Sequence, residues 1–252
     1  MFVGHGMVAF ALVASVATRR GWPSDRALLV GLLAALFATL PDVDMAYALL
    51  GVLGGAEGLV GASEAFWDAA RSVHRGVTHS VVVGAVSAVG FGAWHRAGPG
   101  PWYRAGSRRW GAVALASFGA VGGAAGLAGG PIALGILGLF LLGSLVLVRL
   151  ARTAGFSARV VLLSAMVGLV SHPFGDLLTG SPPGFLFPFE WTVLAERMTL
   201  HPDPTLHLLA AFFVELGTIW MAVVVLARHR GWRLTPSIHR RATLGVGYAG
   251  AV

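Results

Sequence analysis

The chain has 252 residues, of which 56% are hydrophobic and only 12% are charged, with a mean hydropathy of +0.76. A soluble domain of this length carries about a quarter charged residues, so lipid is the expected surroundings of most of the chain. The sequence lacks Cys, which excludes disulfides and thiolate metal sites, and lacks Lys, which excludes a retinal Schiff base.

Long apolar stretches follow one another along the chain, and most approach the length of about 20 residues that a helix needs to cross a bilayer. The first stretch has no basic residues before it, so it is interpreted as a retained helix and not as a signal peptide. The sequence predicts an all-α, polytopic transmembrane bundle of about seven spans, forming one domain over 1–227 with a basic cytoplasmic tail at 228–252. The predicted spans are roughly 4–18, 27–42, 78–94, 111–128, 131–149, 159–178 and 205–227.

Charged residues are sorted between the two sets of connections. Only Arg71, Arg75 and Arg197 of the 18 Arg fall on the face opposite the Arg-rich loops and tail. Nearly all acidic residues fall on that opposite face, apart from Asp25 and from Glu215 inside the seventh span. The positive-inside rule therefore predicts an outside N-terminus and an inside C-terminus in a plasma or inner membrane. The net charge of +7 then reflects cytoplasmic loops, and no nucleic-acid partner is expected.

Polar groups interrupt the apolar pattern at five places, and the seven-span topology puts all five on the extracytoplasmic face. They lie up to about 200 residues apart in the sequence and were not used to derive the topology. The groups are His5; Asp42 and Asp44 in LPDVD; His74, Arg75, Thr78, His79 and Ser80 in HRGVTHS; His172 and Asp176 in SHPFGD; and an acidic loop that includes Glu190, Glu196 and Asp203.

Each group alone also has a structural interpretation. Asp42 and Asp44 fit a helix-end turn after Pro41, Thr78 fits an N-cap, and Arg75 fits a side chain that reaches toward lipid phosphate. His201 and His207 lie on the same face as weaker candidates, and Glu215 has no assigned role.

His172 and Asp176 favour a metal site most clearly. Their i, i+4 spacing presents both side chains from one helix face, where polar groups in an apolar helix need a partner, water or an ion. Imidazole and carboxylate ligands suit zinc, and also manganese or iron, and the number of ligands is enough for one or two ions. The predicted ligands are His5, Asp42, Asp44, His74, His79, His172 and Asp176.

The order of a His near the start, LPDVD, HRGVTHS and SHPFGDLLT resembles the membrane-bound metal-dependent hydrolases, also called LexA-regulated inner-membrane hydrolases. The resemblance runs from His5 to about Trp191, and it departs from the family pattern at Pro173 and in a Gly-rich insert. It implies a site built from the seven predicted ligands together with Arg75, Thr78 and Thr179. More remotely, the ligand order is similar to zinc-dependent phospholipase C and S1/P1-type nucleases, which implies phosphoester cleavage by analogy.

The predicted function is therefore an integral-membrane, metal-dependent hydrolase that cleaves a phosphoester of a membrane lipid or lipid-linked phosphate with a metal-activated water at the extracytoplasmic face. Asp44, His79 and Arg75 are the predicted catalytic residues, Arg75 as a forked donor to a phosphate oxygen. Thr78, Ser80 and Thr179 are expected to orient the ligands through hydrogen bonds. Two alternatives remain: a metal transporter or sensor that uses the same ligands, and a structural membrane protein.

Overall fold

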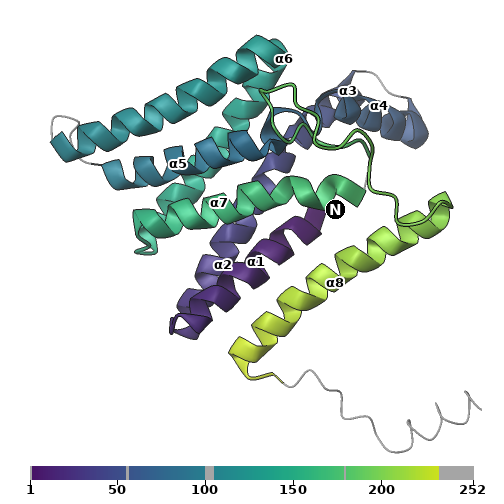
Figure 1. Cartoon of the computed structure of the whole chain (residues 1–252). Coiled ribbons are helices and arrows are strands. Elements are labelled where there is room, and N and C mark those ends of the chain that lie inside the picture. Colours follow the sequence, from purple (N-terminus) through teal and green to yellow (C-terminus); the bar gives the residue numbers. More distant parts are fainter. Residues whose placement is uncertain (1, 55–56, 100–104, 179, 233–252) are drawn as a thin grey trace, which may run out of the picture.

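The computed structural model describes residues 2–54, 57–99, 105–178 and 180–232, and every regular element within them is helical. Each of the seven predicted apolar segments lies largely on a helix (Figure 1). The elements are α1 (Phe2–Arg19), α2 (Ser24–Thr39), η1 (Leu40–Tyr47), α3 (Ala48–Leu53), α4 (Gly58–Val73), η2 (Val77–His79), α5 (Val81–Ala97), α6 (Ala105–Thr153), α7 (Ala158–Gly175), η3 (Asp176–Leu178) and α8 (Pro204–Arg230), where η marks a 3₁₀ helix.

The described helices have the length and composition of a membrane protein. Four stretches are long and apolar enough to cross a bilayer, and two shorter apolar helices accompany them. The membrane character predicted from the composition is thus supported, whereas the number of seven spans and the orientation stay predictions. The four long stretches are Ser24–Leu53, Gly106–Thr153, Ala158–Leu178 and Pro204–Arg230, and the shorter ones are Val3–Arg19 and Val81–Ala97.

Helix α6 covers two of the predicted spans, and it bends sharply between them. Gly130 has φ 63° and ψ −155°, which is not helical, and Pro131 follows it. A proline has no N–H to donate to the preceding turn, and glycine adopts a positive φ without steric cost, so this pair breaks the helix. The two halves of α6 consequently run in different directions (Figure 1).

Close helix crossings at small residues hold α1, α2 and α7 together. A Cβ at Gly31 of α2 would lie 2.9 Å from the carbonyl oxygen of Phe10 in α1. A Cβ at Gly168 of α7 would lie 2.6 Å from the carbonyl oxygen of Ala34 in α2. Because there is no room for a larger side chain at either position, backbones approach as closely as membrane helices do at small-residue contacts.

Large apolar side chains fill the space between these helices and the α5–α6 pair. Phe37 of α2 stacks on Phe91 of α5 with ring centroids 5.8 Å apart, and Phe91 contacts Phe140 of α6 at 6.1 Å. All three rings are completely buried. This cluster fixes α5 and α6 against α2, so the ends of all these helices are placed relative to one another.

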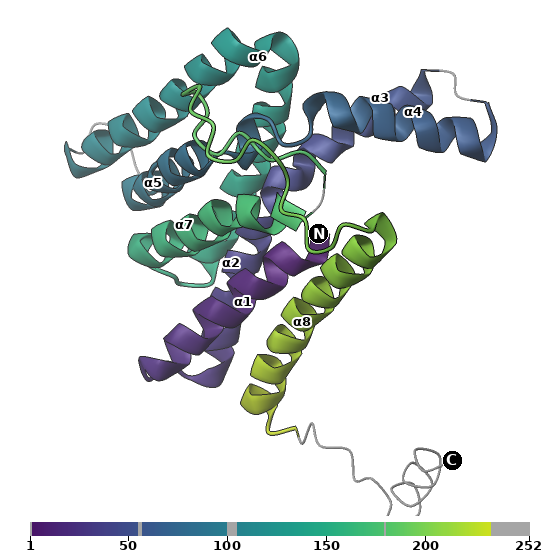
Figure 2. The same ribbon diagram turned by 45° about the vertical axis from the view of Figure 1, so that its right-hand side comes forward.

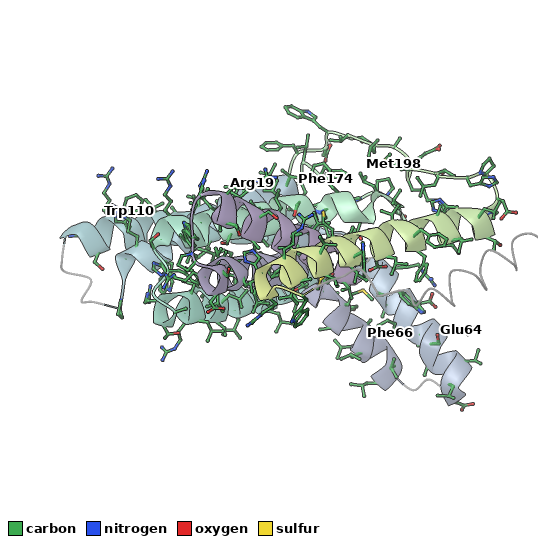
Figure 3. All side chains as sticks on the ribbon, turned by 90° about the horizontal axis from the view of Figure 1, so that it is seen from below. Arg19, Glu64, Phe66, Trp110, Phe174 and Met198 are labelled. Carbon is green, nitrogen blue, oxygen red and sulfur yellow. The ribbon has the colours of Figure 1, made fainter. Side chains whose placement is uncertain are left out.

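The Arg-rich ends of the helices meet at one end of the bundle. Arg152 at the end of α6 donates to the carbonyl oxygens of Trp94 and His95 at the end of α5. Arg26 at the start of α2 donates to the carbonyl oxygen of Gly155, next to the start of α7. In Figure 3, Trp110 near the start of α6 and Glu64 on α4 lie at opposite ends of the molecule. The structure thus keeps these basic contacts together and away from the acidic α4.

Two parts of the chain extend from this core. The α3–α4 hairpin projects sideways from the bundle, and α8 packs mainly on α1 at the periphery (Figure 2). Side chains of α8 such as Phe212 and Phe213 are more than half exposed, which fits a helix that faces lipid. Asp203 caps this helix by accepting hydrogen bonds from the N–H groups of Thr205 and Leu206. The tail beyond Trp232 lies outside the described residues.

The predicted orientation can be tested in a chain that has no native Cys. Ala62→Cys lies on α4, and Gly106→Cys lies near the start of α6, at the Arg-rich end of the bundle. In intact cells, a membrane-impermeant thiol reagent should label position 62 and not position 106, and both should react after the membrane is opened. Labelling of position 106 alone in intact cells would show that the orientation is reversed.

Candidate metal centre

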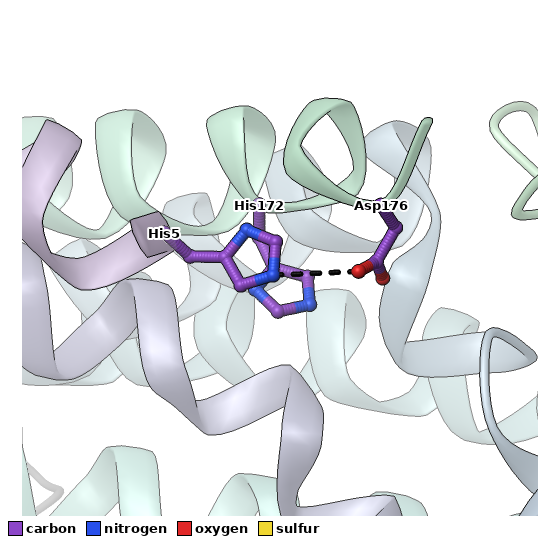
Figure 4. Close-up of side chains that lie close together, drawn as sticks. All are labelled: His5, His172 and Asp176. Carbon is purple, nitrogen blue, oxygen red and sulfur yellow. Dashed lines mark ion pairs between the residues drawn. The ribbon is translucent and has the colours of Figure 1, made fainter. Parts of the chain in front are cut away.

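Four stretches far apart in the sequence bring His and Asp side chains together at one end of the bundle. They are the start of α1, the 3₁₀ helix η1, the segment from the end of α4 through η2, and the junction of α7 with η3. Two triads result, in each of which the donor atoms lie within 4.8 Å of one another. The first triad is His5, His172 and Asp176 (Figure 4), and the second is Asp42, His74 and His79.

The end of α2 shapes the centre of the cluster. Pro41 lacks the N–H that a 3₁₀ turn would direct to the carbonyl oxygen of Ala38, so this carbonyl needs another donor. Nδ1 of His172 donates to it at 2.6 Å, across the crossing of α7 and α2. Since a carbonyl only accepts, the neutral ring of His172 carries its proton on Nδ1 and has a free lone pair on Nε2, the state that a metal ligand requires.

Glycine at position 175 gives His5 its place beside α7. A Cβ at Gly175 would overlap the imidazole of His5, so any other residue would push this ring away from Asp176. As it stands, Nε2 of His5 lies 3.4 Å from Oδ1 of Asp176, and both side chains are buried. The ring of His5 also packs against that of His172, with centroids 4.1 Å apart.

Distances between donor atoms distinguish metal ligands from hydrogen-bonded pairs. Atoms bound at about 2.0–2.1 Å to one tetrahedral ion lie about 3.3–3.4 Å from each other, whereas N–H···O bonds cluster at about 2.9–3.0 Å. Nε2 of His79 lies 3.3 Å from Oδ2 of Asp176 and 3.5 Å from Oδ1 of Asp42. Nε2 of His172 lies 3.5 Å from the same Asp42 oxygen. These separations match the edges of a coordination tetrahedron.

Buried polar atoms in the cluster also lack partners. Among the described residues, Nε2 of His172, Nε2 of His79 and Oδ2 of Asp42 are buried without a hydrogen bond of ordinary geometry. An unsatisfied buried donor or acceptor costs about 1–3 kcal/mol, and three in one place are unusual in a folded protein. A bound cation would satisfy these lone pairs together, so the residues present fit a metal ion.

Asp176 is the carboxylate best placed to join the two triads. Its Oδ1 faces His5 of the first triad, and its Oδ2 faces His79 of the second. Asp176 is therefore the carboxylate that the two triads could share. His172 and Asp176 also fall in one triad, as their spacing predicts, although α7 ends between them at Gly175.

Asp44 lies behind the histidines, and its geometry differs from that expected of a ligand. Its Oδ1 accepts a hydrogen bond from Nδ1 of His74 at 3.0 Å, and its Oδ2 lies 3.3 Å from Nδ1 of His79. The hydroxyl of Thr78 donates to the same Oδ2 at 3.4 Å. Carboxylates commonly hold the outer ring nitrogen of metal-binding histidines in this way. The structure therefore places Asp44 as the group that orients His74 and His79.

Arg75 lies beside the cluster in a strained backbone conformation. Its φ of 70° makes it the one described non-glycine residue with a left-handed φ. Residues held in such strained conformations tend to cluster at functional sites. Its guanidinium donates to the carbonyl oxygen of Ser181, and its Nε lies 3.7 Å from Oδ2 of Asp176. Gly180, itself at φ 62°, leaves the space that this guanidinium occupies.

A cleft of about 580 Å³ opens onto the cluster, within the usual range for small-ligand sites. Its walls carry two cluster carboxylates, two Arg and one large aromatic ring, so an anionic group can enter next to the donor atoms. The polar and aromatic lining includes Asp42, Asp176, Arg71, Arg75, His74 and Trp67.

The remaining predicted residues fall into three groups. Thr78 contacts Asp44 and His79, as expected of an orienting residue. Ser80 instead caps α5 by accepting from the N–H groups of Val82 and Val83, and it donates to the carbonyl of Phe187. Thr179 lies outside the described residues.

Residues that the sequence left without a firm role also have positions. His207 is buried, accepts from the N–H of Leu200 and donates to the carbonyl of Leu178, so it ties α8 to the end of α7. Glu215 accepts from the N–H of Gly4, at the first turn of α1, where a helix end needs an acceptor. His201, Glu190 and Glu196 are exposed and lie outside both triads. In the sequence, the only indication that Glu215 accepts a hydrogen bond inside the bundle is that it lies within an apolar segment.

Comparison with known proteins agrees with the membrane character of the chain. Residues 1–125 match the model of the YdjM inner membrane protein family. The match includes His5 and the LPDVD and HRGVTHS segments, and it ends within α6, before His172 and Asp176. The family description names an inner membrane protein, and together with the apolar helices this match supports a membrane location for the chain. No curated protein and no solved structure matches the chain.

Loss of a ligand should lower the metal content of the purified protein. His172→Ala and Asp176→Ala each remove a donor from the first triad, so both variants should lose much of the roughly one or two equivalents of transition metal expected of the wild type. His201→Ala, an exposed His outside the triads, is the matched control and should keep the wild-type content. Equal metal content in all four proteins, measured by elemental analysis, would contradict the site.

Asp44→Asn should weaken metal binding without removing a ligand. The amide cannot supply the negative charge that holds Nδ1 of His74 and His79, so metal affinity should fall roughly 10- to 100-fold with the stoichiometry at saturation retained. Competition with a chelator of known affinity measures this change. Asp68→Asn, at an exposed acid on α4, should leave the affinity unchanged. A lost equivalent at saturation would instead identify Asp44 as a direct ligand.

Proposed function

We propose that the protein is an integral-membrane, metal-dependent hydrolase that cleaves a phosphoester of an amphiphilic substrate. The observation that carries this proposal is the set of imidazole nitrogens and carboxylate oxygens 3.3–3.5 Å apart beside a cleft with two arginines. Six side chains would hold one or two divalent transition metal ions, with zinc the best fit to mixed imidazole and carboxylate ligands. They are His5, Asp42, His74, His79, His172 and Asp176.

The metal would supply two properties that the side chains lack: it polarises a phosphoryl oxygen and lowers the pKa of a bound water toward neutrality. The chain itself positions these elements. Asp44 holds the rings of His74 and His79, and the carbonyl of Ala38 holds that of His172. A site whose ligands are oriented in advance needs no rearrangement when charge develops on the substrate.

Arg75 is the residue proposed to bind the phosphoryl group. It lines the cleft beside Asp176, and its guanidinium donates to the carbonyl oxygen of Ser181 at the same wall of the cleft. A guanidinium presents two parallel donors to a phosphate, which suits a group that gains negative charge during hydrolysis. Arg71 lines the same cleft with a more exposed side chain, paired with Asp68. In the reaction, water adds to phosphorus, the P–O bond breaks, and the departing oxygen takes up a proton.

In the predicted orientation, the reaction would take place at the surface of the bilayer, where lipid phosphates lie. Under the proposed orientation the cleft opens at the extracytoplasmic end of the bundle, since the Arg-rich helix ends lie at the other end. Lipid phosphates have their phosphoryl groups at this depth, near the bilayer surface. An inner-membrane location is consistent with that class of substrate.

Hydrolysis should depend on metal and on named side chains. Chelator should abolish turnover of phosphoester substrates, and added metal should restore it. His79→Ala should reduce kcat by at least about a hundredfold, because it removes a ligand that faces both Asp42 and Asp176. Arg75→Lys should keep the metal but lower kcat/KM about tenfold or more, since a point charge replaces a two-pronged donor. Steady-state kinetics with metal analysis on each variant measures both effects.

Arg228→Lys on the distant end of α8 is the control for Arg75→Lys and should leave the kinetics unchanged. A metal-loaded wild type that cleaves no phospholipid, polyprenyl phosphate or simple phosphodiester, yet moves metal into liposomes, would contradict the hydrolase. The same ligands would then serve a metal transporter.

A further inference from the structure

A second cavity, separate in its lining from the polar cleft, lies between α1, α7 and α8. It is about 610 Å³ in volume and is an open groove lined almost entirely by apolar side chains. α8 and α7 both pack on α1 (Figure 2), and all three helices contribute lining residues. Representative lining residues are Val8 and Leu12 of α1, Val167 and Val170 of α7, and Val214 of α8.

The groove runs along the helices and away from the metal centre. On α1 its lining extends from His5 to Leu12, and on the antiparallel α7 it extends from Gly175 back to Met166. At a rise of about 1.5 Å per residue these stretches are roughly 10–14 Å long. Both helices are apolar and continue toward the Arg-rich end, so the groove points from the cluster into the hydrocarbon part of the bundle.

His5 connects the groove to the metal centre. Its ring lines the groove, and its Nε2 lies 3.4 Å from Oδ1 of Asp176, which lines the polar cleft on the other side. The donor atoms therefore lie where a charged cleft and an apolar groove meet. A ligand that filled both openings would have a phosphoryl group at the cluster and a hydrocarbon chain along α1.

We propose that the groove between α1, α7 and α8 binds one hydrocarbon chain of a lipid phosphate whose phosphoryl group lies at the metal centre. This proposal rests on the hydrolase function proposed above and specifies its substrate. The charge pattern supports it: Arg75 and Arg71 face the phosphate end, and the other end carries no charged lining residue among those described. A water-soluble phosphoester would leave the apolar groove empty, and the binding free energy of a chain there would be lost.

The groove also predicts chain-length selection. Leu12 lies at its far end on α1, about one turn beyond Val8, and Val167 lies at its far end on α7, more than one turn from His172. A large side chain at either position should fill the far part of the groove, where the end of a long chain would lie. Neither position contacts a predicted ligand through any described hydrogen bond or ion pair, so the cluster should stay intact.

The test compares Val167→Trp and Leu12→Trp with the wild type in the full-length, metal-loaded protein. For a long-chain phosphatidic acid, Val167→Trp should lower kcat/KM about tenfold or more, the effect of about 1.4 kcal/mol in binding. For a water-soluble aryl phosphomonoester, kcat/KM should stay within about twofold, since the substitution lies outside the donor cluster and this substrate has no chain to fill the groove. Leu12→Trp should shift the preference from long to short chains. Leu142→Trp, on the exposed face of α6, is the control and should change neither.

Equal loss of both substrates in Val167→Trp, with unchanged metal content, would overturn the groove proposal while leaving the hydrolase intact. If the wild type cleaves no phosphoester at all, the hydrolase fails, and the groove is tested by binding alone. A phosphatidic acid with a photoreactive group on its chain should then cross-link to α1 and α7, and unlabelled phosphatidic acid should compete while a neutral diacylglycerol should not. Equal competition by both lipids would show that the groove holds ordinary bilayer lipid only, and would overturn the proposal.

Discussion

The gathering of three carboxylates and four imidazoles, buried or half-buried, at one end of an apolar bundle is the constraint on which the rest of the structure depends. Charged groups in such surroundings are costly unless they are paired or bind an ion. Here the pairing is only partly internal: Asp44 is hydrogen-bonded to His74, whereas Asp42 and His172 retain unpartnered atoms. The arrangement could therefore hold a cation that completes it, and the helix ends keep these groups in place.

Backbone features at the helix ends, more than side-chain packing, set the geometry of the centre. Pro41 leaves the carbonyl of Ala38 for His172, and Gly175 leaves space for the ring of His5. The close crossing of α7 and α2 at Gly168 then brings these two ends together. Substitutions at such positions would alter the centre without replacing a ligand, because each one changes the space between neighbouring helix ends.

The polar cleft and the apolar groove give the centre an amphiphilic character that neither opening has alone. Arg75 and Trp67 line one, Val8 and Val167 line the other, and the cluster lies between them. A membrane enzyme that acts on lipid phosphates has to hold a charged head and an apolar chain at the same time. The helices that form the groove, α1 and α7, also carry His5 and His172, so the proposed chain binding and the proposed metal binding would involve the same two helices.

The sequence alone determined the helical membrane class, the positions of the apolar segments and the residue types of the centre, since hydropathy and charge are local properties that can be read along the chain. It also identified His172 and Asp176 correctly as neighbours, because i, i+4 spacing fixes that relation within one helix. Tertiary structure alone decided which atoms face each other across helices. Asp44 orients two histidines, His207 ties α8 to α7 and Glu215 accepts from α1, and no spacing in the sequence distinguishes these roles. The physical reason is that a ligand and an orienting partner are the same residue types, and only the crossing of separate helices selects which oxygen or nitrogen comes within bonding distance.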